Sequence, residues 1–151
     1  MLITSSRKPS INTRVLCKDL AYFFHCESIN RGKMGMKETL SLVEEGSGPL
    51  LIINEYHGNP GALLFYAPDG RELLSVRISA TFGDKTKKNR AYSDTPVATG
   101  NGEIAPILAK ILSIDLVEKP SSPLVLGISN DDLSFFYNGQ CLLKLNIKSI
   151  R

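Results

Sequence analysis

The chain has 151 residues, of which 42% are hydrophobic, and a formal net charge of +3. This length is enough for one ordinary domain whose core needs neither disulfides nor metal ions. No apolar run approaches the roughly 18 residues of a membrane span, and the first ten residues carry their charges after the apolar side chains, the reverse of a secretory signal. We therefore expect a protein that stays inside the cell and makes no contact with membranes.

The cysteines do not predict a structural cross-link. Their number is odd, and no pair has the CxxC spacing of a zinc or redox site; they are Cys17, Cys26 and Cys141. We expect all three to be small buried hydrophobic residues. The sequence thus predicts neither a metal ion nor a cofactor.

The first predicted helix is amphipathic. Residues 1–6 predict a short strand, after which Ser10 can cap a helix that runs to about His25. A projection at about 100° per residue places one set of side chains on a basic stripe: Arg14, Lys18 and His25. The opposite stripe is apolar: Leu16, Leu20 and Phe23. One face is therefore predicted to be buried and the other to be basic.

A second helix and three strands complete the first half. A linker at 28–33 precedes a predicted helix over 37–45, which Gly46 ends. Its apolar stripe consists of Met36, Leu40 and Val43. Strands are predicted over 50–56, 63–66 and 72–80. The turns between them are predicted at 58–61 and 68–70, where glycine, proline, asparagine and aspartate favour turn geometry.

The second half has a similar order of elements. A polar segment at 80–102, with its centre at 83–97, predicts an exposed and mobile basic connection. A helix follows at 105–113, with Pro106 in its first turn. Its expected buried side chains are Ile104, Ile107, Leu108 and Ile111. Strands are predicted over 124–128, 133–137 and 141–150, and Asn138-Gly139 predicts a tight hairpin between the last two.

The halves also match in sequence. Gly70 corresponds to Gly139, and Leu73-Leu74 to Leu142-Leu143. The apolar alternation of the strand that follows also repeats: Leu74, Val76 and Ile78 correspond to Leu143, Leu145 and Ile147. We predict one α/β (α+β) domain made of two similar helix-plus-strands units, at about 1–82 and 98–151. Chance is the alternative, because any two amphipathic hairpins share a period of two.

Positive charge is concentrated in two segments. Residues 1–37 have a net charge of +5, residues 84–91 a net charge of +3, and the rest of the chain −5. Such segregation steers polyanions toward one side of a molecule, although a solvated surface with clustered lysines is an equal alternative. The helix N-terminus near Ser10 adds backbone N–H groups that suit a phosphate oxygen. The predicted RNA-binding set is Arg7, Lys8, Ser10, Arg14, Lys18, Arg31, Lys33, Lys85, Lys87, Lys88 and Arg90.

The sequence offers little for catalysis. Its two histidines, His25 and His57, lie in no nucleophile, metal or phosphate motif. Gly32-Lys33 lacks both the glycine spacing of a P-loop and the Ser or Thr that follows its lysine. Cys26 adjoins His25, but catalytic partners seldom are neighbours in the chain. We therefore expect no enzyme and no small-molecule substrate.

Several motifs together resemble one known family. The first is Ser-Arg-Lys-Pro-Ser at 6–10, which precedes Arg14 and Lys18-Asp19-Leu20. The second is Ile29-Asn30-Arg31-Gly32, and the third is Gly58-Asn59-Pro60-Gly61. The segment 129–135 of the second half matches more weakly. In this order and spacing the chain resembles the Brix-domain family of ribosome-biogenesis proteins, and within it the members of the small-subunit processome. The likeness extends over nearly the whole chain.

The resemblance implies two halves that are each akin to the anticodon-binding domain of some aminoacyl-tRNA synthetases. It also implies binding of ribosomal RNA precursors without catalysis, through the basic positions of the matched motifs: Arg7, Lys8, Arg14, Lys18, Arg31 and Lys33. Many relatives carry terminal extensions, whereas we expect a bare domain here, which suits an archaeal protein. Because archaea have no nucleolus, the expected location is the cytoplasm. Phe136 stands where relatives often have a basic residue, so the second half is expected to contribute less to RNA binding. The alternative function is a scaffold that captures other ribosome-assembly proteins and contacts RNA incidentally.

Overall fold

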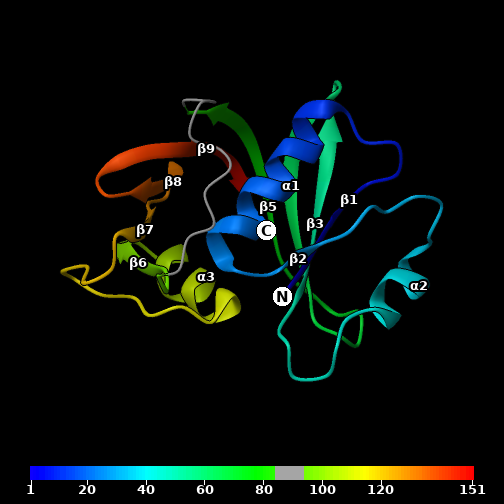
Figure 1. The fold of residues 1–151 in the computed structure, drawn as a ribbon, viewed down its shortest axis with the longest axis horizontal. Helices are drawn as coiled ribbons and strands as arrows, with labels where there is room; N and C mark the ends of the chain where they lie inside the picture. Colours follow the sequence, from blue (N-terminus) through cyan, green and yellow to red (C-terminus); the bar gives the residue numbers. More distant parts are fainter. Residues whose placement is uncertain (84–93) are drawn as a thin grey trace.

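A computed structural model describes residues 1–83 and 94–151 of the chain. In this described part, nine strands form a single sheet in the order β2-β1-β3-β4-β5-β9-β8-β7-β6 (Figure 1). The first-half elements are β1 (Leu2–Ser5), α1 (Ile11–Phe24), β2 (Glu27–Ser28), α2 (Met36–Ser41), β3 (Leu50–Tyr56), β4 (Asn59–Tyr66) and β5 (Glu72–Phe82). The second-half elements are β6 (Val97–Gly100), α3 (Ile104–Leu112), β7 (Leu124–Ile128), β8 (Asp132–Tyr137) and β9 (Gln140–Ile150).

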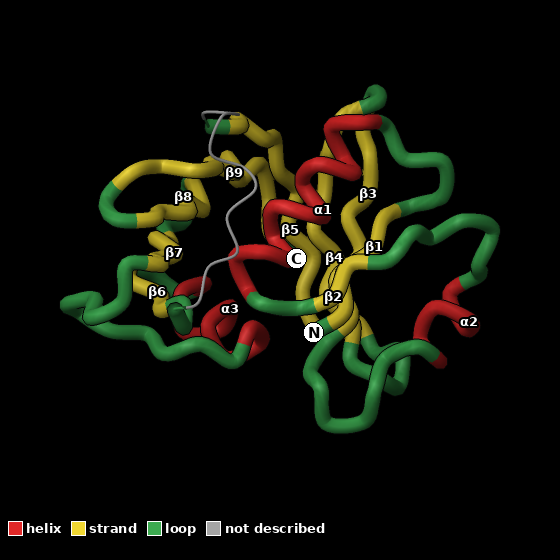
Figure 2. Tube along the Cα trace, viewed as in Figure 1, coloured by secondary structure: helices red, strands yellow, loops and turns green. Residues whose placement is uncertain are grey.

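The two halves of the sheet have the same connectivity. In the first, β1 is parallel to β2 and β3, and β3, β4 and β5 form an antiparallel meander. In the second, β6 is parallel to β7, and β7, β8 and β9 form the matching meander. A parallel bridge from Ala98 to Leu116 takes the place of the β1–β2 pair. The halves join where β5 and β9 pair antiparallel at the centre of the molecule (Figure 2).

The repeat extends to an irregularity in pairing. Between β4 and β5 the register skips Leu73, and between β8 and β9 it skips Leu142, which is the position matched to Leu73 in the sequence. Both bulges directly follow the connection between the two strands, where an extra residue bends the pair. The structure therefore contains two similar halves, while the exact limits of each half stay a prediction.

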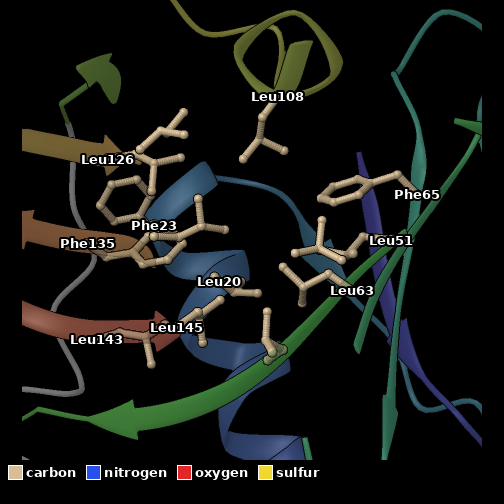
Figure 3. Close-up of a cluster of buried hydrophobic side chains, with 14 of the residues drawn as sticks. Leu20, Phe23, Leu51, Leu63, Phe65, Leu108, Leu126, Phe135, Leu143 and Leu145 are labelled. Atoms are coloured by element: carbon tan, nitrogen blue, oxygen red, sulfur yellow. The ribbon is translucent and has the colours of Figure 1, made fainter. Parts of the chain in front are cut away.

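The helices α1 and α3 cover one face of the sheet. Figure 3 shows Leu20 and Phe23 of α1 between first-half strands and second-half strands, with Leu108 of α3 beside them. The ring of Phe23 meets that of Phe135 edge to face, with the centroids 5.0 Å apart. Burial of a side chain of this size contributes about 1.5–3 kcal/mol to stability. A single core thus fixes α1 relative to both halves.

Among the residues that the structure describes, α2 covers the other face of the sheet at its β1 end. Leu2, Leu50 and Ile52 form a small cluster there, against which the predicted stripe of Met36, Leu40 and Val43 packs. The helix ends at Ser41 rather than at residue 45, because the chain tightens there: the N–H of Leu42 donates to Thr39 and that of Val43 to Leu40. The apolar side chains of α2 were predicted correctly, but the helix is shorter than the sequence predicts.

Three other expectations about elements were wrong. Two strands, β2 and β6, were missed, and β6 lies inside the segment predicted to be an exposed connection although Val97 and Ala98 are buried. The β3–β4 turn is His57-Gly58, both with positive φ, as a two-residue hairpin requires. The predicted turn at 58–61 was therefore too late by one residue and too long. The part of the connection at 84–93 lies outside the described residues.

The burial of some side chains also differs from the prediction. Ile107 is 50% exposed, because α3 turns Ile104, Ala105, Leu108 and Ala109 toward the core instead. Of the cysteines, Cys17 is buried, Cys26 is half-buried and Cys141 is exposed on β9, so the expectation of three buried cysteines was wrong. No helix among the described residues has the length and apolar character that crossing a membrane requires.

Candidate nucleic-acid interface

Two loops of the first half enclose a basic hollow. One loop joins β1 to α1 and the other leads from β2 to α2, and both lie beyond the N-terminal half of the sheet (Figure 1). The hollow has a volume of about 600 Å³ and is called the basic pocket below. It is lined by Arg7, Lys8, Pro9, Arg14, Asn30, Arg31, Gly32 and Lys33. Five of the predicted binding cations therefore converge in space although they come from separate stretches of the chain.

Two arginines hold the loops together. The Nε–H of Arg7 and the Nε–H of Arg31 both donate to the carbonyl oxygen of Met34, at 3.3 and 2.8 Å. Arg31 also donates from a terminal nitrogen to the carbonyl oxygen of Ser5, at 3.2 Å. A guanidinium has five N–H donors, so each arginine retains donors for a ligand. The pocket is thus partly organised before any anion binds.

Lys8 occupies an unfavourable backbone conformation. Its φ is +54°, in the left-handed region that favours glycine, and Pro9 follows it. A non-glycine residue there costs about 1–2 kcal/mol. Lys8 is exposed and lines the pocket. The strain therefore coincides with a candidate ligand-binding position, as it often does in binding sites.

The pocket cations are not neutralised by carboxylates in the part of the chain that the structure describes. The ion pair that the described residues form joins Lys144 and Asp132, which lie in the second half and not in the pocket. Like charges that share a hollow repel one another and lower the stability of the free protein. A bound polyanion would relieve this repulsion.

A carboxylate from another element lies at the N-terminus of α1. Ser10 caps the helix as predicted, with its hydroxyl oxygen accepting from the N–H of Thr13. The backbone N–H of Ser10, however, donates to a carboxylate oxygen of Glu55 on β3. The hydroxyl of Thr13 donates to the same oxygen at 2.7 Å. The N–H groups of Ser10 and Thr13 are therefore already occupied, and a role of Ser10 in RNA binding stays a prediction.

The surroundings of Glu55 shift its pKa. Partial burial raises the pKa of this carboxyl, but hydrogen bonds from the Ser10 backbone and from the hydroxyls of Thr13 and Ser10 outweigh burial and lower it overall. The group is therefore an anion in the folded protein at neutral pH. Sequence reasoning missed Glu55 because its role depends on a contact between residues 45 positions apart.

The remaining predicted residues lie outside the basic pocket. Lys18 is exposed on α1, four residues beyond Arg14 on the stripe that the projection predicted, but does not line the pocket. The last four predicted residues lie outside the described part of the chain: Lys85, Lys87, Lys88 and Arg90. Asn30, whose amide can both donate and accept hydrogen bonds, lines the pocket together with the cations.

Comparison with curated proteins identifies the family. A probable Brix domain-containing ribosomal biogenesis protein of Methanococcoides burtonii is 43% identical over 151 residues, which is all of this chain and 96% of that protein. One from Archaeoglobus fulgidus is 30% identical over 99% of this chain and 95% of its own length. The chain belongs to the Brix-domain family of ribosomal biogenesis proteins. No family model matches the sequence.

Solved structures agree with this assignment. The archaeal Imp4-like protein Mil superposes with a TM-score of 0.79 at 26% identity, covering 100% of this Brix-domain chain and 99% of Mil. A probable ribosomal biogenesis protein from Aeropyrum pernix superposes with a TM-score of 0.76, covering 97% of this chain and 93% of the other. At 21% identity the second likeness shows the fold alone. The family and the mixed α/β fold were both predicted correctly. The expected likeness to an anticodon-binding domain stays a prediction.

Proposed function

We propose that this Brix-domain protein is a non-catalytic, cytoplasmic assembly factor that binds ribosomal RNA precursors through the basic pocket. The observation that carries the proposal is the convergence of Arg7, Lys8, Arg14, Arg31 and Lys33 in one hollow with no described carboxylate partner. Arginine forks match phosphate oxygens, and contacts of this kind position a nucleic acid backbone without reading its bases. The related proteins' names, which refer to ribosomal biogenesis, support RNA as the polyanion.

Catalysis finds no support in the same region. The pocket is lined by arginine, lysine, asparagine, proline and glycine, and contains neither a carboxylate nor a histidine to move a proton. Among the described residues, no cluster of three or more histidine, cysteine, aspartate or glutamate side chains is placed to hold a metal ion. We therefore assign the pocket to binding.

The test is charge reversal at the two pocket cations with the least structural involvement. Arg7 and Arg31 hold the loops, so Arg14 and Lys33, which are both exposed, are the better choice. Arg14→Glu combined with Lys33→Glu should weaken binding to a ribosomal RNA precursor transcript by at least about a hundredfold, since two phosphate contacts are lost and two negative charges are added beside the RNA backbone. Thermal unfolding should show that the variant is folded.

The matched control is Lys110→Glu combined with Lys119→Glu. It changes the net charge by the same amount, on α3 and on the loop before β7, on the side of the molecule away from the pocket loops (Figure 1). This control should bind within about threefold of the wild type, apart from a small long-range effect of charge. Equal losses in both variants would show that total charge, and not the pocket, determines binding. Partners that remain bound in cell extracts after nuclease treatment would favour the scaffold function instead.

A further inference from the structure

A second hollow of about 600 Å³ lies where the two halves of the sheet meet. It is called the Tyr56 hollow below and is lined by Tyr56, His57, Asn59, Pro60, Gly61, Arg77, Ile78, Ser79, Lys148 and Ser149. These residues belong to the β3–β4 hairpin and to β5 and β9, which join the halves. Its composition differs from that of the basic pocket, because it combines two aromatic rings with two cations.

The aromatic group of the hollow is displayed on the surface. The side chain of Tyr56 is 58% exposed, and the Arg77 guanidinium carbon lies 5.0 Å from the centroid of its ring. The ring of His57 meets that of Tyr56 edge to face, with the centroids 4.1 Å apart. Tyrosine is enriched at binding interfaces, where its ring supplies a large contact area. Contacts from Arg77 and His57 hold the ring in one orientation while leaving much of it accessible.

Local backbone irregularities shape the hollow. The β3–β4 pairing skips Gly61, and a Cβ at this glycine would lie 2.5 Å from the Cβ of Tyr56. The β5–β9 pairing skips Lys148, which is opposite the step from Arg77 to Ile78. Bulges redirect side chains, and they concentrate next to functional sites. Both bulges here lie at residues that line the hollow, and Gly61 permits the close approach that places Tyr56.

The Tyr56 hollow is connected to the basic pocket through α1. The side-chain amide of Asn12 in the first turn of α1 donates to the side-chain oxygen of Asn59 in the hairpin, at 3.3 Å. Arg14, two residues further along α1, lines the basic pocket. In Figure 1 the start of α1 and the tip of the β3–β4 hairpin lie together. One extended ligand can therefore pass from one hollow to the other over this end of the molecule.

We propose that the Tyr56 hollow binds an unpaired nucleotide of the RNA whose backbone occupies the basic pocket. The base stacks on the ring of Tyr56, and Arg77 and Lys148 contact its phosphate. Stacking on an exposed aromatic side chain, combined with nearby cations, is how proteins hold single-stranded RNA without strong sequence preference. A base inside a duplex already stacks on its neighbours, so the hollow favours single-stranded over double-stranded segments. This inference rests on the proposed function of the basic pocket.

The test compares a single-stranded oligouridylate of about 12 nucleotides with an RNA duplex of the same length. Tyr56→Ala should weaken binding of the oligouridylate about tenfold or more, while binding of the duplex changes less than about twofold. Tyr56→Phe keeps the ring and should bind like the wild type. Tyr22→Ala removes an exposed tyrosine of α1 that lines neither hollow, and should have no effect.

A second measurement needs no variant. Ultraviolet crosslinking of the wild-type protein to an oligonucleotide that contains 4-thiouridine, followed by mass spectrometry, should locate adducts on the peptide that contains Tyr56. Absence of such adducts, or unchanged oligouridylate binding by a folded Tyr56→Ala protein, would overturn the inference. If the wild type binds neither RNA, or if the Arg14→Glu and Lys33→Glu protein binds normally, the proposed function itself fails. These outcomes separate the two proposals.

Discussion

The hydroxyl of Thr13 donates to the carboxylate of Glu55 across 2.7 Å, joining the first turn of α1 to the end of β3. The same carboxylate accepts from the backbone N–H of Ser10. A negative charge at a helix N-terminus also interacts favourably with the helix dipole. Glu55 thus completes the cap of α1 from another element, and it fixes the helix that carries Arg14 in relation to the sheet.

Replacement of Glu55 by glutamine should lower stability. The neutral side chain keeps the shape but loses charge-assisted hydrogen bonds and the dipole interaction. Since the carboxylate is in contact with solvent, the loss should be modest, about 1 kcal/mol in the free energy of unfolding at neutral pH. Urea unfolding of both proteins measures it. The matched comparison is Glu55→Asp, whose shorter side chain keeps the charge and therefore separates the effect of geometry from that of charge.

The pH dependence of this difference has a definite sign. The pKa of Glu55 is lowered in the folded protein, so its contribution is present above the pKa of the unfolded chain and is lost as the pH falls through the folded pKa. The wild type and Glu55→Gln should therefore converge in stability as the pH is lowered. A difference that stays constant in acid would show that the carboxylate's charge does not stabilise the helix cap.

Two glycines with positive φ should respond differently to alanine. At Gly100, at the end of β6, a Cβ would lie 1.9 Å from the carbonyl oxygen of Ile128, whereas at Gly139 it would meet nothing within 4 Å. Gly139→Ala incurs only the backbone cost, about 1 kcal/mol. Gly100→Ala adds a clash with a neighbouring strand and should cost about 3 kcal/mol or more. Chemical denaturation compares them, and equal losses would contradict the packing of β6 against β7.

The strand β6, which contains Gly100, could not be predicted from the sequence. The long strands and α1 were predictable because their apolar side chains repeat with a period of 2 or 3.6. The strand β6 has four residues and no such period, and its position depends on parallel pairing with β7. Pairing between distant segments is not visible in local composition.

The candidate site, too, could be predicted only in part from the sequence. The basic positions of the two loops could be predicted from charge and from the family resemblance, and their convergence in one pocket agrees with that prediction. The hydrogen bonds from Arg7 and Arg31 to Met34, and from Ser10 to Glu55, could not be predicted. Each joins segments whose proximity results from the fold. Sequence patterns therefore indicated which basic positions are candidates for a site, and the tertiary contacts determined which groups are already occupied.

The cysteines should differ in reactivity. Burial raises the pKa of Cys17 to about 12 and that of Cys26 to about 11, although for Cys26 the positive N-terminus opposes the effect of burial. The thiolate is the reactive form, so both should react slowly, whereas Cys141 is exposed. Iodoacetamide should modify Cys141 first in the native protein and all three cysteines in denaturant, as followed by mass spectrometry. Rapid modification of Cys17 in the native protein would contradict its buried position.

Binding of RNA by the basic pocket should depend steeply on salt. Each phosphate that a cation neutralises releases counterions, and log K falls by about 0.7–0.9 per phosphate for each log unit of salt. If the five pocket cations each contact one phosphate, the slope should be about −4. Lys33→Gln removes one such contact and should reduce the magnitude of the slope by about 0.7–0.9, whereas Lys119→Gln, outside the pocket, should leave it unchanged. Fluorescence anisotropy titrations over a range of potassium chloride concentrations measure both slopes. A slope near zero, or the same decrease in both variants, would mean that the pocket cations do not contact the RNA backbone.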